Sequence, residues 1–373
     1  MRCEDPVPAP ALDAIRAPLA ALNATLSDPP VIQPLNLMLD LAGEAMRARL
    51  FVVQDEGGRE ACLRPDFTVA ITREHFRSGG ASGRYRYEGR AFRVAPAGAL
   101  DSHPEEFLQV GVEVFGEPAS PGADAEILGA AWRAACAGGR GDLSLRLGDV
   151  ALFGAVLSSL DVAPEVAGRL VRALGRPRQL SVLLQRAGRD AALDAQEARI
   201  AGLPRDAAMA AIEAIWAQKD LEPIGGRGAA EIAERLAAKA FAARSPRLTA
   251  AQLKTIDRYL ALSGAPQDVL SDVKTLTGGA AAQAALESWA GRLAGFRQAG
   301  VDLTRATLNT RFSRAFGYYD GFLFEVLSAS LPADAPLAAG GRYDGLTERL
   351  GGMTSSAVGC MVRPARVWME TGR

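Results

Sequence analysis

The chain has 373 residues, 49% hydrophobic and 23% charged, which is enough for one large domain with an insertion or for two domains. Its 42 basic and 43 acidic residues give a net charge of −1. Since nucleic-acid binders usually carry a basic excess, we predict no nucleic-acid partner. No stretch approaches the roughly 20 apolar residues of a membrane span, and residues 1–19 lack the apolar run of a signal peptide. We therefore expect a cytoplasmic protein with no membrane partner.

The four cysteines are far apart and form no CxxC pair. This spacing disfavours a zinc site or a disulfide framework and is typical of a reducing compartment. We predict neither a metal nor a cofactor.

The predicted elements place strands at the two ends of the chain and helices between them. Periodicity predicts helices over residues 10–26, 38–49, 68–76 and 124–137, and strands over 31–35, 50–53, 60–63, 85–93, 107–115 and 143–147. Residues 150–300 are rich in Ala, Leu, Arg and Glu at helical spacing, and strand patterns return at 322–327 and 356–362. This order predicts an α+β fold built on an antiparallel sheet.

The segment FLQVGVEVF at 107–115 has a strand pattern with two different faces. Alternation puts three valines on one face, and Gln109, Gly111 and Glu113 on the other. The two polar side chains are about 13 Å apart along the strand and flank a residue without a side chain. A small polar ligand could lie on this floor. The alternative is a half-buried strand whose polar face meets water, although a glycine inside a strand favours the close approach of another group.

Three other segments carry polar groups that suit ligand binding or simple packing equally well. LRPDFT at 63–68 offers a carboxylate and a hydroxyl two positions apart, and GYYDG at 317–321 places adjacent phenols in a turn. AGGRYDG at 339–345 is rich in glycine but matches neither the GxGxxG nor the Walker pattern, so it is weak evidence for nucleotide binding.

Taken in order, these segments resemble histidyl-tRNA synthetases. The matching stretches are LRPDFT at 63–68, YRYEGRAFR at 85–93, FLQVGVEVFG at 107–116, GADAEIL at 122–128, FGYYDGFLFEV at 316–326, and AGGRYDGL with AVGCMVRPAR up to 366. The resemblance covers nearly the whole chain except its middle. It implies a class II aminoacyl-tRNA synthetase-like antiparallel sheet flanked by helices, in a dimer formed through the first signature motif, which residues 31–34 match.

The resemblance also implies a pocket for free histidine. Asp66 and Thr68 would hold the α-ammonium group, Arg93 the α-carboxylate, and Gln109 either of them. Glu113 and Tyr319 would bind the two imidazole nitrogens, with Arg314 and Tyr318 beside them. Charge-assisted hydrogen bonds to a zwitterion are strong, and a carboxylate at one ring nitrogen would favour the imidazolium form. Two positions depart from the family: Asp66 replaces a glutamate, and Phe67 replaces a glycine.

The ATP side departs further from the family pattern. The acidic and basic residues expected after Arg93 are absent from the run 94–99, and Gly317 stands where the family has an acid. Arg363 occupies the place of a glycine that leaves room for adenine, whereas Arg366, which would stack on the base, is retained. Losing one electrostatic group can slow a reaction about 100-fold or more. We therefore predict no catalytic residues.

A histidine binder without ATP chemistry resembles the regulatory subunits of ATP phosphoribosyltransferase. This resemblance implies a non-catalytic subunit that activates the short-form catalytic subunit and senses histidine in the first step of histidine biosynthesis, as a homodimer within a hetero-oligomer. We expect synthetase-like parts at 1–150 and 301–373, a mostly helical part at 151–300, and no anticodon-binding domain. The alternatives are a truncated synthetase-like enzyme that adenylates histidine, and a structural or RNA-associated relative with an empty pocket.

Overall fold

The computed structural model describes residues 3–54, 56–95, 103–187, 195–219, 228–244, 247–314 and 317–369. Its strands are β1 (Thr25–Leu26), β2 (Ile32–Pro34), β3 (Val52–Gln54), β4 (Glu60–Leu63), β5 (Gly83–Phe92), β6 (Glu106–Phe115), β7 (Leu143–Asp149), β8 (Ser263–Gly264), β9 (Ala306–Asn309), β10 (Phe322–Ser328), β11 (Ala338–Arg342) and β12 (Ala357–Val362). The helices are α1 (Ala9–Ala20), α2 (Leu35–Ala42), the 3-10 helix η1 (Glu44–Arg49), α3 (Thr68–Arg77), α4 (Pro121–Cys136), α5 (Val150–Ser159), α6 (Pro164–Ala173), α7 (Pro177–Ala187), α8 (Ala195–Ala201), α9 (Arg205–Lys219), α10 (Ala229–Arg244), α11 (Ala250–Leu260), α12 (Pro266–Leu276), α13 (Gly279–Gln298), α14 (Asp344–Arg349) and α15 (Pro364–Val367).

The main sheet has nine strands in the order β1-β5-β6-β12-β11-β10-β7-β9-β8, and a second sheet has the order β2-β4-β3. The pairs from β5 to β7 are all antiparallel, which confirms the predicted α+β class. The pairs β1–β5 and β7–β9 are parallel, a feature that the sequence pattern did not predict.

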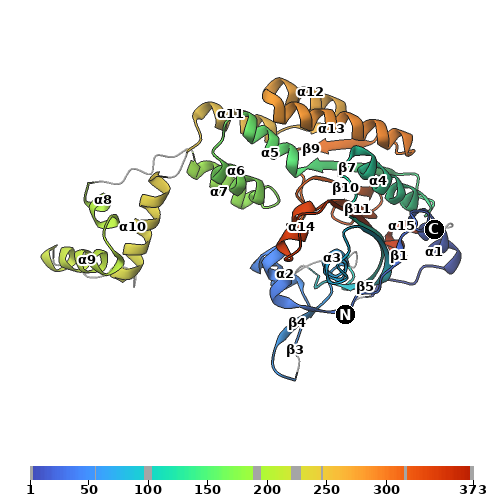
Figure 1. Cartoon of the computed structure of the whole chain (residues 1–373), viewed down its shortest axis with the longest axis horizontal. Helices are drawn as coiled ribbons and strands as arrows, with labels where there is room; N and C mark the ends of the chain where they lie inside the picture. The colour runs from blue at the N-terminus through green and yellow to red at the C-terminus, as the bar shows by residue number, and fades with distance from the viewer. Residues whose placement is uncertain are drawn as a thin grey trace.

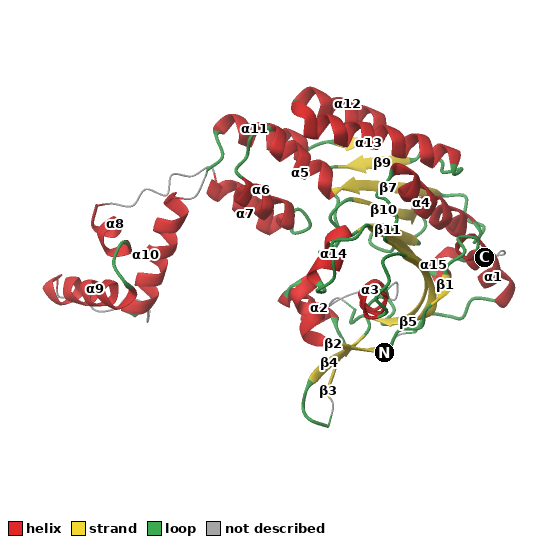
Figure 2. Ribbon diagram, viewed as in Figure 1, coloured by secondary structure: helices red, strands yellow, loops and turns green. Residues whose placement is uncertain are grey.

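Helices cover both faces of the main sheet (Figure 1, Figure 2), and each face has its own apolar core. Helices α1, α4, α5 and α13 contribute to the core on one face. Helices α2, α3 and α14 contribute to the core on the other. Local sequence signals start several of these helices: the side chain of Ser120 accepts a hydrogen bond from Ala123 N at the start of α4, and that of Asp149 from Leu152 N at the start of α5. The sheet is therefore buried on both sides.

Strand β11 was predicted as a glycine-rich segment, but it is a central strand of the sheet. A Cβ on Gly340 would lie 2.2 Å from the carbonyl oxygen of Gly359 on β12. Gly341 has φ +150° and would place a Cβ 2.4 Å from the carbonyl oxygen of Phe322 on β10. The glycines are required here because the neighbouring backbones come too close for a side chain.

Helices also dominate the described residues between 151 and 300, but they pack in two places. Helices α5 and α13 belong to the core of the main sheet. Helices α8, α9 and α10 lie away from the sheet and share a small core of their own around Ile200 and Ile212 (Figure 1). Among the described helices, none combines the length and the apolar character needed to cross a membrane.

Candidate functional site

Strand β6 has the two faces that its alternation predicts. Val110, Val112 and Val114 pack in the core to which α1 and α4 contribute. Gln109 and Glu113 lie on the opposite face, where they are 0% and 1% exposed. The alternative in which this polar face meets water is therefore wrong.

All eight residues predicted for the histidine pocket line one small pocket. Its lining consists of Asp66, Thr68, Arg93, Gln109, Glu113, Arg314, Tyr318 and Tyr319, together with Tyr87, Gly359, Cys360 and Met361. About 310 Å³ of empty space lies between these side chains and at the mouth. This figure includes open solvent, and the space that a water-sized sphere can occupy is only about 10 Å³, room for about one water molecule. An amino acid therefore fits only after the lining side chains move apart.

The floor between Gln109 and Glu113 is not open. Tyr87 on β5 pairs directly with Gly111, and a Cβ on that glycine would lie 2.4 Å from Cζ of the Tyr87 ring. The Tyr87 hydroxyl donates to the carbonyl oxygen of Cys360 at 3.3 Å. Glycine is needed here because this ring and the carbonyl oxygen of Cys360, 2.2 Å from such a Cβ, leave no room for a side chain. A ligand has to lie beside the ring. The alternation that puts Arg93 in the pocket also puts Tyr87 on that side of β5, so the sequence held a signal for it.

Phe67 occupies the position where the resemblance expected a glycine. It is fully buried and stacks on Tyr87 with ring centroids 4.4 Å apart. Its other neighbour is the guanidinium group of Arg64, 4.0 Å from the ring centroid. Phe67 thus holds in place the ring of Tyr87, which lines the pocket.

Two hydroxyl groups hold the carboxyl group of Glu113. Thr68 Oγ1 donates to Oε1 at 2.7 Å, and the hydroxyl of Tyr343 donates to Oε2. Gly359 on β12 leaves space for this group, since a Cβ there would lie 1.7 Å from Oε2. The sequence did not predict Tyr343 and Gly359, because their role depends on strand pairing that no local pattern shows.

Several polar atoms of the pocket have no hydrogen-bond partner among the described residues. They are Oδ1 of Asp66, both side-chain polar atoms of Gln109, and Nε of Arg314. Asp66 and Arg314 each use another atom in a hydrogen bond. The Tyr318 hydroxyl donates to Asp66 Oδ2 at 3.2 Å, and Arg314 Nη1 donates to Glu325 Oε1 at 2.6 Å. An unsatisfied buried polar group costs about 1–3 kcal/mol. The pocket therefore presents a carboxylate, an amide and a guanidinium that together suit a small zwitterion.

Burial changes the charge state of the pocket. It raises the pKa of Glu113 to about 8, although the hydrogen bonds from Tyr343 and Thr68 oppose the shift. It also raises the pKa of Asp66, against the attraction of Arg93, and lowers the pKa of Arg93 to about 10. Glu113 is thus mostly protonated at neutral pH. This changes the expectation of a carboxylate that favours an imidazolium, since a neutral carboxyl group can donate to a neutral imidazole nitrogen.

Arg363 fills the side on which the resemblance placed adenine. Its side chain is 4% exposed, forms an ion pair with Glu4, and lies 3.6 Å from the ring centroid of Phe107. Arg366 donates to the carbonyl oxygen of Pro336 at 3.1 Å. Of the run after Arg93, residues 96–99 lie outside the described part of the chain.

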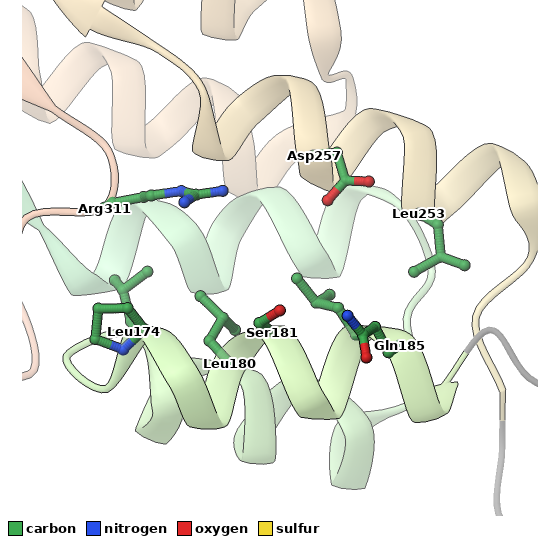
Figure 3. Close-up of a pocket in the computed structure, with 9 residues that line it drawn as sticks. Leu174, Leu180, Ser181, Gln185, Leu253, Asp257 and Arg311 are labelled. Atoms are coloured by element: carbon green, nitrogen blue, oxygen red, sulfur yellow. The ribbon is translucent and has the colours of Figure 1, made fainter.

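A second hollow lies between α7 and α11 (Figure 3). Leu180 and Ser181 face it from α7, Leu253 and Asp257 from α11, and Arg311 closes one end (Figure 3). It contains none of the predicted residues, and none of the unpartnered buried polar atoms of the described chain lies in it. It therefore lacks the chemistry of the first pocket.

Comparison with known proteins identifies the fold. The family model described as histidyl-tRNA synthetase matches residues 26–200 and 212–367. A solved structure described as an ATP phosphoribosyltransferase regulatory subunit/histidyl-tRNA synthetase, from Bacillus halodurans, covers 98% of this chain and 80% of its own, with TM-score 0.66 and 18% identity. A histidyl-tRNA synthetase from Nostoc sp. covers 96% of this chain and 69% of its own, with TM-score 0.59 and 16% identity. The predicted class II synthetase-like fold is confirmed.

Closer sequence relatives carry a single description. The ATP phosphoribosyltransferase regulatory subunit of Agrobacterium fabrum is 34% identical, and the match covers 89% of this chain and 88% of the relative. That of Rhizobium etli is 36% identical, and the match covers 89% of each chain. That of Allorhizobium ampelinum is 34% identical over 95% of both chains. These relatives confirm the prediction of a regulatory and not a catalytic subunit. The chain belongs to the family of ATP phosphoribosyltransferase regulatory subunits.

Proposed function

We propose that this chain activates the short-form catalytic subunit of ATP phosphoribosyltransferase and inhibits the assembly when its pocket binds histidine. Asp66 and Thr68 receive the α-ammonium group, Arg93 the α-carboxylate, and Gln109 either. Glu113 and Tyr319 bind the imidazole nitrogens, and Arg314 and Tyr318 complete the wall. By linkage, whatever histidine does to the assembly's affinity for substrates, substrates do to its affinity for histidine.

The observation that carries this proposal is the convergence of unpartnered buried groups in one small pocket. Asp66 offers an acceptor for an ammonium group, and Gln109 offers both a donor and an acceptor. Arg314 offers a donor for a carboxylate or a ring nitrogen. A zwitterionic amino acid requires opposite charges at separate places, and these groups supply them.

Calorimetry with the purified chain tests the pocket. We expect Gln109→Ala to weaken histidine binding about 10- to 100-fold, because hydrogen bonds to charged groups contribute about 1.5–3 kcal/mol. Gln267→Ala is the matched control, since Gln267 is exposed on α12 and remote from the pocket. Equal affinities of both variants and the unchanged chain would exclude this pocket as the histidine site.

Reconstitution tests the regulation. The chain is mixed with a short-form catalytic subunit, and phosphoribosyl transfer is measured with and without histidine. We expect the chain to raise the activity, and histidine to lower it only when the chain carries Gln109. Activity and inhibition that do not depend on the chain would refute the proposal.

We also propose a homodimer formed around β2. Val31, Ile32 and Val52 are 40%, 60% and 39% exposed and lie on, or directly beside, β2 and β3, the two outer strands of the β2-β4-β3 sheet. Exposed apolar clusters of this kind mark protein contacts. Light scattering on Ile32→Asp tests the interface, and the exposed Met353→Asp is the control. A dimer that survives Ile32→Asp unchanged would place the interface elsewhere.

The proposal includes a cytoplasmic location and the division of the chain at residues 150 and 300. Adenylation of histidine is not part of it, because Arg363 and Glu4 occupy the side where adenine would lie. Histidine-dependent exchange between ATP and pyrophosphate would contradict this exclusion.

A further inference from the structure

The segment before α1 is attached to β6 and to the start of α15 through Glu4. Cys3, Asp5, Pro6 and Pro8 are exposed, whereas the Glu4 side chain keeps only 7% of its exposure. The backbone N–H of Glu4 donates to the carbonyl oxygen of Glu106 at 3.3 Å, next to an isolated parallel bridge between Cys3 and Glu106. One buried carboxylate is thus the main anchor of an otherwise exposed segment.

The carboxylate of Glu4 has two partners far along the chain. Arg363, at the start of α15, donates to Oε1. The backbone N–H of Leu108 on β6 donates to Oε2 at 3.1 Å. A guanidinium and a backbone N–H aimed at two oxygens of one anion form an arrangement that also suits phosphate or any other oxyanion.

Arg363 requires an anion at this place. It is 3% exposed, and its Nε has no partner among the described residues. Burial lowers the pKa of Arg363 to about 9, and the neighbouring cations Arg366 and Arg93 add to this effect against the attraction of Glu4. Without Glu4, a buried guanidinium beside two like charges would have no compensating carboxylate close to it.

This anchor is one aromatic ring away from the ligand pocket. Arg363 lies 3.6 Å from the ring centroid of Phe107, and Arg93, which lines the pocket, lies 5.4 Å from the same centroid. Leu108, which holds the other oxygen of Glu4, is next to Gln109 on β6. A change at Glu4 therefore acts on residues adjacent to the pocket.

We propose that Arg363 and the Leu108 N–H form an anion site that the N-terminal segment closes with its own Glu4, and that a phosphate-type anion displaces Glu4 and releases residues 3–8. The segment is a strap whose side-chain anchor is one exchangeable carboxylate, with the backbone hydrogen bond from Glu4 to Glu106 beside it. Arg366 increases the positive potential at the site and favours a multiply charged anion over a carboxylate. Release of the strap exposes Arg363 and frees the Leu108 N–H beside the pocket.

Hydrogen exchange of the full chain tests the strap, with inorganic pyrophosphate as the probe and sodium chloride to hold the ionic strength constant. We expect exchange in residues 3–8 to increase at the Glu4 N–H, which loses its hydrogen bond to Glu106, when pyrophosphate is added; Pro6 and Pro8 carry no N–H. In Arg363→Gln the same residues should exchange fast without pyrophosphate, and pyrophosphate should have no further effect. Unchanged exchange in the unsubstituted chain, or full protection of residues 3–8 in Arg363→Gln, would overturn the proposal.

Affinity provides a second measurement with a variant that keeps the shape of the side chain. Glu4→Gln removes the competing charge, and we expect it to bind pyrophosphate about tenfold more tightly than the unsubstituted chain. Asp5→Asn is the matched control, because Asp5 is adjacent, acidic and exposed. Equal pyrophosphate affinities of Glu4→Gln and Asp5→Asn would also overturn the proposal, whatever happens to histidine binding.

Discussion

Asp124 on α4 holds two buried arginines, and its replacement by Asn should strongly destabilise the fold. Its side chain is 0% exposed and accepts from Arg292 Nε at 2.6 Å and from Arg342 Nη2 and Nε at 2.7 and 3.1 Å. Hydrogen bonds to charged groups contribute about 1.5–3 kcal/mol each. Arg342 keeps its bond to Asp344 and Arg292 its bond to Asp149, so the loss is smaller than the sum. We expect about 3–5 kcal/mol, the usual result of breaking a buried pair.

Urea and thermal unfolding of Asp124→Asn measure this loss. For a chain of this length, a decrease of 3–5 kcal/mol corresponds to a fall in the melting temperature of about 4–6 °C. Asp272→Asn is the control, because Asp272 is exposed on α12, and it should change stability by less than about 0.5 kcal/mol. If Asp124→Asn lost less than about 1 kcal/mol, the desolvation of these charges would offset their attraction, and the reasoning from hydrogen bonds would fail.

Three further predictions concern the pocket. Burial raises the folded-state pKa of Glu113 from 4.5 to about 8, so the unfolded chain releases this proton at lower pH than the folded chain does. The stability that Glu113 contributes is therefore present below about pH 4.5 and is lost as the pH rises to about 8. Over that window Glu113→Gln should gain stability relative to the unchanged chain by up to about 1.4 kcal/mol per pH unit. If the urea midpoints of the two chains differed by the same amount at pH 5 and at pH 8, this prediction would be wrong. Gly359→Ala would place a Cβ 1.7 Å from Glu113 Oε2, so calorimetry should show loss of histidine binding, whereas Gly278→Ala, with open space around its Cβ, should bind as before. Phe67→Ala removes the ring stacked on Tyr87 and should destabilise the chain by about 3–5 kcal/mol in the same unfolding assay; a loss below 1 kcal/mol would show that the site collapses around the smaller side chain.

The sequence predicted those parts of the fold whose signals are local. The alternation in β6 predicted which face carries Gln109 and Glu113, and the order of strands and helices predicted the α+β class. The residues of the pocket, however, came from the resemblance. Asp66, Gln109 and Tyr319 belong to three separate segments, and periodicity alone gave no reason to bring them together. Each of these segments, taken singly, suited packing as well as it suited binding.

The features that sequence reasoning missed depend on contacts between distant segments. Strand β11 has glycines where strands usually have branched residues, and only the approach of β10 and β12 explains them. Tyr343 reaches Glu113 across 230 positions of the sequence, and the pair of Arg363 and Glu4 spans 359. No window of local pattern contains both partners of such contacts. The parallel pairs at β1 and β9 escaped prediction because a few residues carry too little periodicity to specify direction.

The contacts of the retained motifs explain how a chain can keep the pattern of a synthetase while one side of its site is filled. Asp124 comes from GADAEIL, and Arg342 and Asp344 come from AGGRYDGL, yet none of the three lines the pocket. Asp344 N and Gly345 N donate to Asp320, which follows the tyrosine pair, so the buried arginine network leads directly to the turn that carries Tyr318 and Tyr319. These residues hold the turn in place whatever the pocket binds. Arg363, in contrast, lies in a retained segment but fills space with a new ion pair. A retained motif here therefore indicates a retained framework, and function has to be argued from the groups that remain unpartnered inside it.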